Sequence, residues 1–135
     1  MKYLVDANVL SEATKPAPDP KVVEWLRGNE AELVVDPIIL GEIRFGIDIM
    51  PAGRRRRRLE SWFSEGIAMI ACVDWDASTG LRWAKLLAKL RRSGESLPIK
   101  DSLIAATALL HDFVVVTRNV RDFRKTGVEI LDPFG

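Results

Sequence analysis

The sequence of 135 residues has a single cysteine, a single histidine and no long hydrophobic run. With Cys72 alone the chain cannot form an internal disulfide, so we expect a reducing compartment. Cys72 lies in the apolar segment 67–73, and we expect it to be a small core residue. No apolar stretch approaches the roughly 18–20 residues of a membrane helix, and Asp6 interrupts the apolar run that a signal peptide would need. These absences favour a cytoplasmic protein with no membrane partner.

The composition is that of a globular protein with one concentrated basic segment. Hydrophobic residues make up 47% of the chain and charged residues 29%, and the length suits one domain spanning residues 1–135. The net charge is +1, from 20 basic and 19 acidic residues. Five consecutive arginines, Arg54 to Arg58, account for this balance, because without them 15 basic residues face 19 acidic ones. No internal repeat is visible.

Short apolar strands alternate with helices along the whole chain. The dipeptides Asp19-Pro20 and Asp36-Pro37 each combine a capping residue with a proline that suits the first helical position. Strands are predicted at 3–5, 32–35, 67–73, 113–117 and 128–131. The longer helices are predicted from 36 to about 50, from the arginine run at 54 through Phe63, from a cap at Asp76 or Ser78 through Leu90, and from about 100 to about 111. This alternation predicts an α/β fold, with a short, mostly parallel central sheet flanked by helices on both faces.

The first predicted strand ends at a carboxylate. Tyr3 to Val5 form an apolar run that stops at Asp6, and the polar Asn8 and a helical segment follow. In open parallel α/β sheets, ligands bind outside the carboxyl ends of the strands. Asp6 is therefore a candidate metal ligand.

Glu42 does not resemble an ordinary surface charge. Its neighbours at helical spacing are apolar or small, namely Ile38, Ile39, Phe45 and Gly46. Glu42 thus leans toward the buried side without a local cation, which is unfavourable unless a positive charge compensates it. The alternative is a glutamate at the edge of the apolar stripe that reaches water.

Asp101 and Asp122 each have a functional and a purely structural interpretation. Asp101 also has apolar neighbours, but it begins a helix, where a carboxylate can cap the first turn or interact with the helix dipole. Asp122 follows the strongest predicted strand, but Arg118 and Lys125 lie at pairing distance on a helix. Either aspartate could therefore be a structural residue.

Taken together, the four acids predict a metal site. Carboxylates that converge without a cation repel one another, and a divalent ion would offset that repulsion. Ligation by oxygen alone, without histidine or cysteine, favours Mg²⁺ or Mn²⁺ over zinc. This donor set suits phosphodiester hydrolysis, in which a metal activates water and stabilises the leaving oxygen.

Four segments in order carry a family resemblance that extends over essentially the whole chain. They are Tyr3-Leu4-Val5-Asp6-Ala7-Asn8-Val9-Leu10-Ser11-Glu12, Leu40-Gly41-Glu42-Ile43-Arg44-Phe45-Gly46-Ile47, Leu97 to Ala108 and Thr117-Arg118-Asn119-Val120-Arg121-Asp122-Phe123. With them the chain resembles PIN-domain ribonucleases, specifically the VapC-type toxins of toxin–antitoxin pairs and their FitB/StbB-like branch. The closing segment 127–134 resembles the same branch.

The resemblance implies a site, a fold and a set of partners. It implies that Asp6, Glu42 and Asp101 hold the metal and that Asp122 completes the catalytic quartet. Relatives often carry an acid at the position of Asn119. Asn8, Thr117 and Asn119 would then be supporting polar residues in a PIN-like α/β/α sandwich. The implied activity is Mg²⁺-dependent endonucleolytic cleavage of RNA, with Mn²⁺ as a possible substitute. The implied partners are RNA, a VapB-like antitoxin and a second copy of the chain, within a dimer or a larger assembly.

The arginine run and two other functional classes stay open at this point. Arg54, Arg55, Arg56, Arg57 and Arg58 could follow an RNA backbone or an acidic antitoxin segment, or they could be a solvated helix start. A non-catalytic RNA-binding protein that uses these arginines is one alternative to the nuclease. A phosphohydrolase with Asp6 as nucleophile is the other, although haloacid-dehalogenase phosphatases carry a second aspartate where this chain has Asn8.

Overall fold

The centre of the molecule is a five-stranded parallel sheet. The computed structural model describes residues 1–135, with the strands in the order β3-β2-β1-β4-β5. The strands are β1 (Tyr3–Val5), β2 (Leu33–Val35), β3 (Ala71–Cys72), β4 (Val114–Val116) and β5 (Ile130–Leu131). In the register, Leu4 of β1 lies beside Val34 of β2 on one side and Val115 of β4 on the other. The three central strands are apolar at nearly every position because helices cover both faces.

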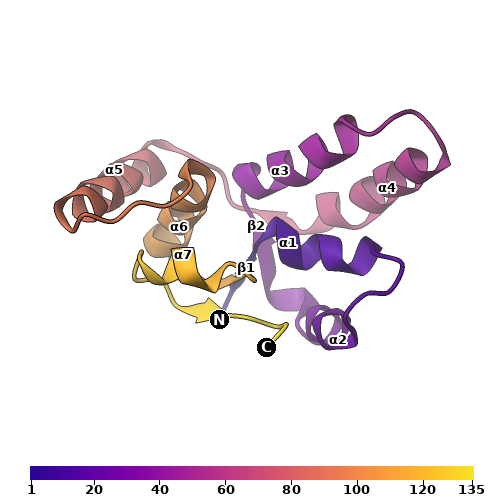
Figure 1. Ribbon diagram of the computed structural model, residues 1–135, viewed down its shortest axis with the longest axis horizontal. Helices are drawn as coiled ribbons and strands as arrows, with labels where there is room; N and C mark the ends of the chain where they lie inside the picture. Colours follow the sequence, from indigo (N-terminus) through magenta and orange to yellow (C-terminus); the bar gives the residue numbers. More distant parts are fainter.

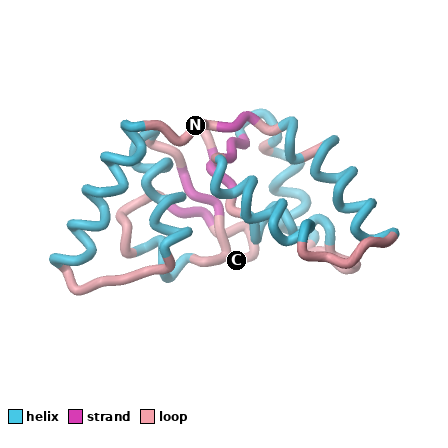
Figure 2. The backbone as a smooth tube through the Cα atoms, turned by 90° about the horizontal axis from the view of Figure 1, so that it is seen from above, coloured by secondary structure: helices cyan, strands magenta, loops and turns pink.

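Helices flank the strands on both sides. They are α1 (Ala7–Leu10), α2 (Pro20–Gly28), α3 (Pro37–Asp48), α4 (Arg54–Glu65), α5 (Ala77–Arg92), α6 (Ile99–His111) and α7 (Val120–Arg124). Figure 1 shows α5, α6 and α7 on one side of the central strands and α1 to α4 on the other. Seen from above, the strands occupy the middle with helices to either side (Figure 2). The predicted α/β fold with a parallel central sheet is confirmed.

Local sequence signals set several helix starts. Asp19 accepts a hydrogen bond from the backbone N–H of Lys21 at 2.9 Å, and Asp36 accepts one from Ile39 at 2.9 Å. Each aspartate precedes a proline at the first helical position, as the sequence predicted. No helix has both the length and the apolar character required to cross a membrane.

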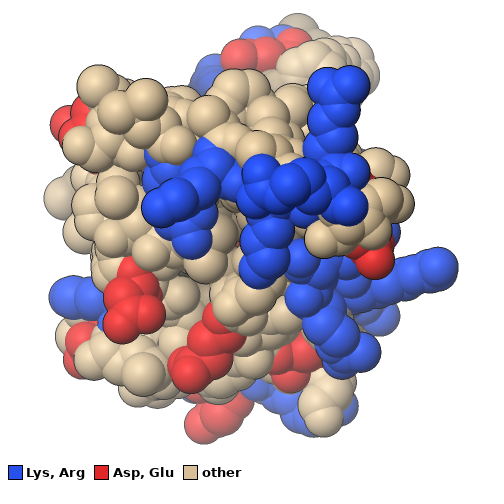
Figure 3. Space-filling view, turned by 90° about the vertical axis from the view of Figure 1, so that its left-hand side faces the viewer, with Lys and Arg blue, Asp and Glu red and all other residues tan.

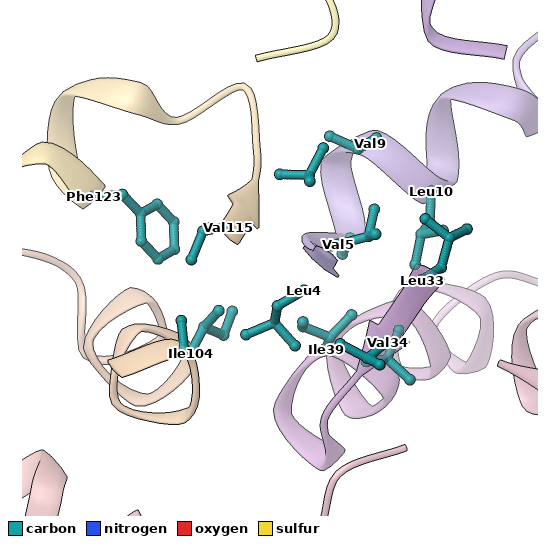
Figure 4. Close-up of a cluster of buried hydrophobic side chains, with 14 of the residues drawn as sticks. Leu4, Val5, Val9, Leu10, Leu33, Val34, Ile39, Ile104, Val115 and Phe123 are labelled. Carbon is teal, nitrogen blue, oxygen red and sulfur yellow. The ribbon is translucent and has the colours of Figure 1, made fainter. Parts of the chain in front are cut away.

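The core lies between β1 and the helices on either side of it. Leu4, Val5, Ile39 and Ile104 are all inaccessible to solvent. Figure 4 shows Leu4 between Ile104 of α6 and Ile39 of α3, so this one side chain packs between the two helices. Fully burying an aliphatic side chain of this size contributes about 1.5–3 kcal/mol. The core thereby holds the two helices that carry Asp101 and Glu42 against the strand that ends at Asp6.

The segment 67–73 differs from its prediction. Ile67–Met69 form a 3₁₀ turn, and only Ala71–Cys72 form a strand. Cys72 is exposed, so its assignment to the core was wrong. The reason is its position, because β3 is a two-residue edge strand that pairs only with β2. Apolar composition indicated burial here, but only Ile67 of the 3₁₀ turn is buried.

Asp36 links α3 to α6 through a buried hydrogen bond. It follows β2 directly, is fully buried, and accepts a bond from the Thr107 hydroxyl of α6 at 2.8 Å. Burial raises the pKa of the Asp36 carboxyl, while its hydrogen bonds act in the opposite direction. Asp36 therefore joins the start of α3 to the middle of α6.

We expect Thr107→Val to lower the free energy of unfolding by about 1–3 kcal/mol, because a buried carboxylate oxygen of Asp36 loses its donor. Urea unfolding at neutral pH, followed by circular dichroism, measures this change. Ser61→Ala, on the exposed surface of α4, is the control and should change stability by less than about 0.5 kcal/mol. A Thr107→Val protein as stable as the wild type would show that Asp36 does not depend on this hydroxyl.

Candidate functional site

The structure brings the four predicted acids together at the carboxyl end of the sheet. Asp6 directly follows β1, and Asp122 lies in the first turn of α7, shortly after β4. Asp101 lies in the first turn of α6, and Glu42 lies on α3. The negative charges of Asp6, Asp122 and Glu42 all act on Asp101 and raise its pKa. The four carboxylates thus form one electrostatic unit, which we call the acid cluster.

Asp6 is buried and held by three donors. One carboxylate oxygen accepts the backbone N–H of Ala7 at 2.8 Å. The other accepts the Thr117 hydroxyl at 2.8 Å and the Asn8 amide at 3.3 Å. Burial raises the pKa of Asp6, and the hydrogen bond from Thr117 opposes that rise. Asn8 and Thr117, predicted as supporting polar residues, both contact this carboxylate.

Asp101 is the most perturbed acid of the cluster. Its side chain is 6% exposed, and it accepts the Asn119 amide at 2.6 Å. The backbone N–H of Asn119 in turn donates to the Thr117 hydroxyl at 2.9 Å. Burial, followed by the charges of its three acidic neighbours, raises the pKa of Asp101 to about 6. Thr117 and Asn119 therefore connect the carboxylates of Asp6 and Asp101.

Glu42 has a cationic partner that sequence analysis missed. The ammonium group of Lys100 donates to one of its oxygens at 2.9 Å, across 58 positions of sequence. This hydrogen bond raises the pKa of Lys100. The other oxygen of Glu42 is buried and has no hydrogen-bond partner. The position of Lys100 next to Asp101, inside a matching segment, was the available signal, but the contact depends on the packing of α3 beside α6.

Asp122 lies at the margin of the cluster. Its side chain is 25% exposed and pairs with Lys125 at 3.6 Å. The ion pair that sequence analysis held as the alternative for Asp122 is therefore present. Asp122 still acts on Asp101 through its charge, so it belongs to the cluster electrostatically.

The donor set suits a hard divalent cation. As the side chains stand, no group of three or more acids, histidines or cysteines is arranged to hold an ion, and Lys100 and Asn119 engage oxygens of Glu42 and Asp101. The cluster nevertheless offers carboxylate oxygens alone, one of them buried without a partner. Its mutual repulsion is visible in the raised pKa of Asp101. Mg²⁺ or Mn²⁺ would fit these ligands and relieve that repulsion.

The arginine run lies at the start of α4. Arg56 contacts Asp48 at 3.8 Å and Glu60 at 3.7 Å and donates to the carbonyl of Met50 at 3.0 Å. The other four arginines are exposed and point in different directions around the helix, because consecutive residues cannot share one face. No hydrogen bond or ion pair joins the run to the acid cluster.

A hollow of about 820 Å³ lies away from the acid cluster. It is lined mostly by apolar side chains and includes Lys2, Leu33 and Ala71. These residues lie at the amino ends of β1, β2 and β3, whereas Asp6 follows the carboxyl end of β1. The hollow and the acid cluster are therefore separate features.

Comparison with known proteins places the whole chain among related sequences. The PIN domain family matches residues 3–129. VapC ribonuclease Y4jK of Sinorhizobium fredii is 37% identical over 97% of this chain and 96% of that protein. Plasmid stability protein StbB of Pseudomonas syringae pv. tomato is 33% identical, with 97% of each chain covered.

Solved structures share the fold. The FitAcB structure from Neisseria gonorrhoeae matches with a TM-score of 0.91 and 26% identity, covering 98% of each chain. The DNA-bound VapBC structure from Salmonella typhimurium matches with a TM-score of 0.84 over 98% of each chain, at 24% identity. Both structural matches cover nearly the full length of this chain.

The geometry predicts a pH titration at Asp101 that depends on Asp6. In metal-free protein, the carboxyl carbon resonance of Asp101 should titrate near pH 6, well above the ordinary value of 3.8. Removing a neighbouring negative charge with Asp6→Asn should lower this pKa, because ionised Asp101 is then repelled less. Carbon-detected NMR across pH 3–9 measures both values.

Asp74→Asn is the matched control for this titration, because it removes an exposed carboxylate outside the cluster. It should leave the Asp101 midpoint in place. An equal midpoint in wild type and Asp6→Asn would show that Asp6 does not act on Asp101.

Proposed function

The chain belongs to the PIN-domain family, and from this we propose that it is a metal-dependent endoribonuclease, the toxin of a toxin–antitoxin pair. The names of relatives support this proposal, among them VapC ribonuclease Y4jK and the tRNA(fMet)-specific endonuclease VapC of Salmonella typhimurium, which is 26% identical. The observation that carries the proposal is the acid cluster, whose members come from four separate segments. Asp6 and Asp101 of this cluster have no cationic side chain paired with them, and a metal ion would supply the missing positive charge.

Asp6, Glu42 and Asp101 would hold the cation, and Asp122 would complete the negative pocket. When bound, Mg²⁺ or Mn²⁺ supplies an activated water for attack on phosphorus and stabilises the charge that develops on the leaving oxygen. Thr117 and Asn8 hold the carboxylate of Asp6 in a fixed orientation through their hydrogen bonds.

Two further residues hold the carboxylates of the cluster in the metal-free protein. Asn119 donates to Asp101 and fixes its carboxylate. Lys100 supplies the positive charge that stabilises Glu42 in the metal-free protein. Ionised Asp101 is the form that binds a cation, so protons compete with the metal at this position as the pH falls toward 6.

We propose a VapB-like antitoxin as the protein partner, in a complex that can contain more than one copy of each chain. Structures described as FitAcB and VapBC complexes support this proposal, because they match nearly the whole chain. Phe45 of α3 and Ile49, which directly follows α3, support a homodimer, since they lie four positions apart and are 64% and 66% exposed. Large apolar side chains in such an arrangement favour contact with another protein surface.

The two alternatives fit the site less well. RNA binding without cleavage would use the arginines but would leave the acid cluster without a purpose. A phosphohydrolase with Asp6 as nucleophile would resemble the haloacid-dehalogenase phosphatases, which carry a second aspartate where this chain has Asn8. Hydrolysis by a metal-activated water makes use of all four acids.

We expect the purified protein to cleave a mixed RNA pool in the presence of Mg²⁺ but not in EDTA. Asp6→Asn, Glu42→Gln and Asp101→Asn should each reduce the cleavage rate by about 100-fold or more, because each removes a charged ligand from the metal. Gel analysis of labelled RNA measures the rate, and isothermal titration with Mg²⁺ measures metal binding in the same variants.

Asp74→Asn serves as the control and should cleave at the wild-type rate. Structured tRNA and rRNA should be tested beside the mixed pool, because a toxin with a narrow substrate range would leave most RNA intact. Equal cleavage by wild type and all three acid-cluster variants would assign the activity to a contaminant or to a different site.

A further inference from the structure

Helix α5 carries a line of cations with no acidic residue among them. Its sixteen residues include five lysines or arginines and no aspartate or glutamate. Four of them, Arg82, Lys85, Lys89 and Arg92, are separated by three, four and three positions. This spacing places them on one side of a helix, over a length of about 15 Å. We call these four residues the α5 stripe.

The stripe lies beside the buried side of α5 and faces the segment that follows α7. Leu86 and Leu90 of α5 are buried in the core, while three of the four stripe residues are exposed and Arg82 is half-buried. The Lys89 ammonium nitrogen lies 3.9 Å from the point that a β-carbon on Gly127 would occupy. Lys89 therefore lies on the edge of α5 that faces the segment after α7.

No acid of this chain neutralises the stripe. None of its four side chains takes part in an ion pair or a hydrogen bond, in contrast to Arg44 and Arg56, which share Asp48 and Glu60. Helix α7 adds Arg121 and Arg124, which are exposed and equally unpaired. Figure 3, which looks onto the α5 side of the molecule, shows lysine and arginine side chains gathered in a band across this face. Like charges in such a line destabilise a helix slightly, so a polyanionic ligand would stabilise it.

The same elements connect the stripe to the acid cluster. Helix α7 carries both Asp122 and the two exposed arginines. Helix α6, which carries Asp101, packs on α5, and the Trp83 indole N–H of α5 donates to the Ser102 hydroxyl at 3.0 Å. The half-buried Arg82 directly precedes Trp83, so one end of the stripe lies near the first turn of α6. A ligand along the stripe would thus be held next to the catalytic residues.

We propose that the α5 stripe, extended by Arg121 and Arg124, binds the phosphate backbone of the RNA substrate. This inference rests on the proposed function and identifies the surface that holds its substrate. Evenly spaced single cations match a chain that carries one negative charge per nucleotide. Lysine and arginine contacts of this kind fix position and orientation without reading the base sequence.

The stripe suits this role better than the arginine run of α4. The run spreads its charges around the helix, and it commits Arg56 to Asp48 and Glu60. The stripe keeps its four charges aligned and unpaired on the side of the molecule that carries α6 and α7 (Figures 1 and 3). Each segment has four cations without an ion pair, and these two sets of four differ in geometry, which makes them a matched pair for mutation.

The test measures RNA binding separately from cleavage. All proteins carry Asp6→Asn and are assayed in EDTA by fluorescence anisotropy, with a labelled mixed-sequence RNA of 20 nucleotides and with poly-L-glutamate of similar charge as probes. The stripe variant combines Arg82→Gln, Lys85→Gln, Lys89→Gln and Arg92→Gln. The control variant combines Arg54→Gln, Arg55→Gln, Arg57→Gln and Arg58→Gln, which removes the same total charge. Glutamine retains good helix propensity, and circular dichroism with thermal melting checks that both variants are folded.

We expect the stripe variant to bind RNA at least about tenfold more weakly at 0.1 M salt and to lower the slope of log K against log salt by about 3, since four phosphate contacts are lost. The control variant should stay within about threefold of its parent. An unchanged stripe variant, or equal losses in both variants, would overturn the inference. A loss of poly-glutamate binding as large as the loss of RNA binding would also overturn it and would assign the stripe to an acidic protein segment.

Cleavage by proteins with Asp6 intact separates this inference from the proposed function. With the stripe variant, KM for RNA should rise at least about tenfold while kcat stays within about twofold, because the acid cluster is unaltered. If the stripe variant cleaves RNA in a metal-dependent way with an unchanged KM, the stripe does not bind the substrate, and the proposed nuclease activity still stands. A different outcome is a wild-type protein that cleaves none of the mixed, tRNA or rRNA substrates while its RNA binding still depends on the stripe. That result would reject the proposed nuclease activity and leave the stripe as an RNA-binding surface.

Discussion

Repulsion among buried carboxylates is the constraint on which the rest of this structure depends. Asp6 and Asp101 are almost inaccessible to solvent, and together with Glu42 and Asp122 they form one coupled set of charges. Such a set would be unstable on a flexible scaffold, because each side chain would move toward water. The hydrogen bonds from Thr117, Asn8 and Asn119, and the ammonium group of Lys100, hold the carboxylates in place in the metal-free protein.

The parallel sheet supplies the rigidity that this repulsion requires. Three apolar central strands each end at a buried polar residue, Asp6 after β1, Asp36 after β2 and Thr117 after β4. Asp6 and Thr117 belong to the site, whereas Asp36 anchors α3 and, through Thr107, α6. The carboxyl edge of the sheet therefore performs two tasks, since it positions acids of the cluster and also joins the helices that carry the remaining acids.

The two basic segments of the outer surface, the arginine run of α4 and the α5 stripe, differ in how their charges are arranged. The arginine run of α4 dominates the sequence, yet it disperses around a helix and is partly neutralised by Asp48 and Glu60. The α5 stripe is inconspicuous in the sequence because other residues separate its members. Helical geometry aligns those members, and the packing of α5 on α6 places them on the side of the protein where Asp101 and Asp122 lie. The acid cluster and the α5 stripe are thus separate but adjacent.

The sequence alone determined the alternation of strands and helices, the all-oxygen character of the site and the identity of its candidate acids. These features are patterns within single segments of the chain, namely the apolar runs that stop at Asp6 and Asp36 and the apolar neighbours of Glu42. The tertiary structure decided what depends on contacts between distant segments. It paired Lys100 with Glu42, joined Asp101 to Asn119, left Cys72 exposed on an edge strand and brought Lys89 of the stripe close to Gly127. These outcomes follow from how the elements pack against each other, and a pattern confined to one segment of the chain does not contain that information.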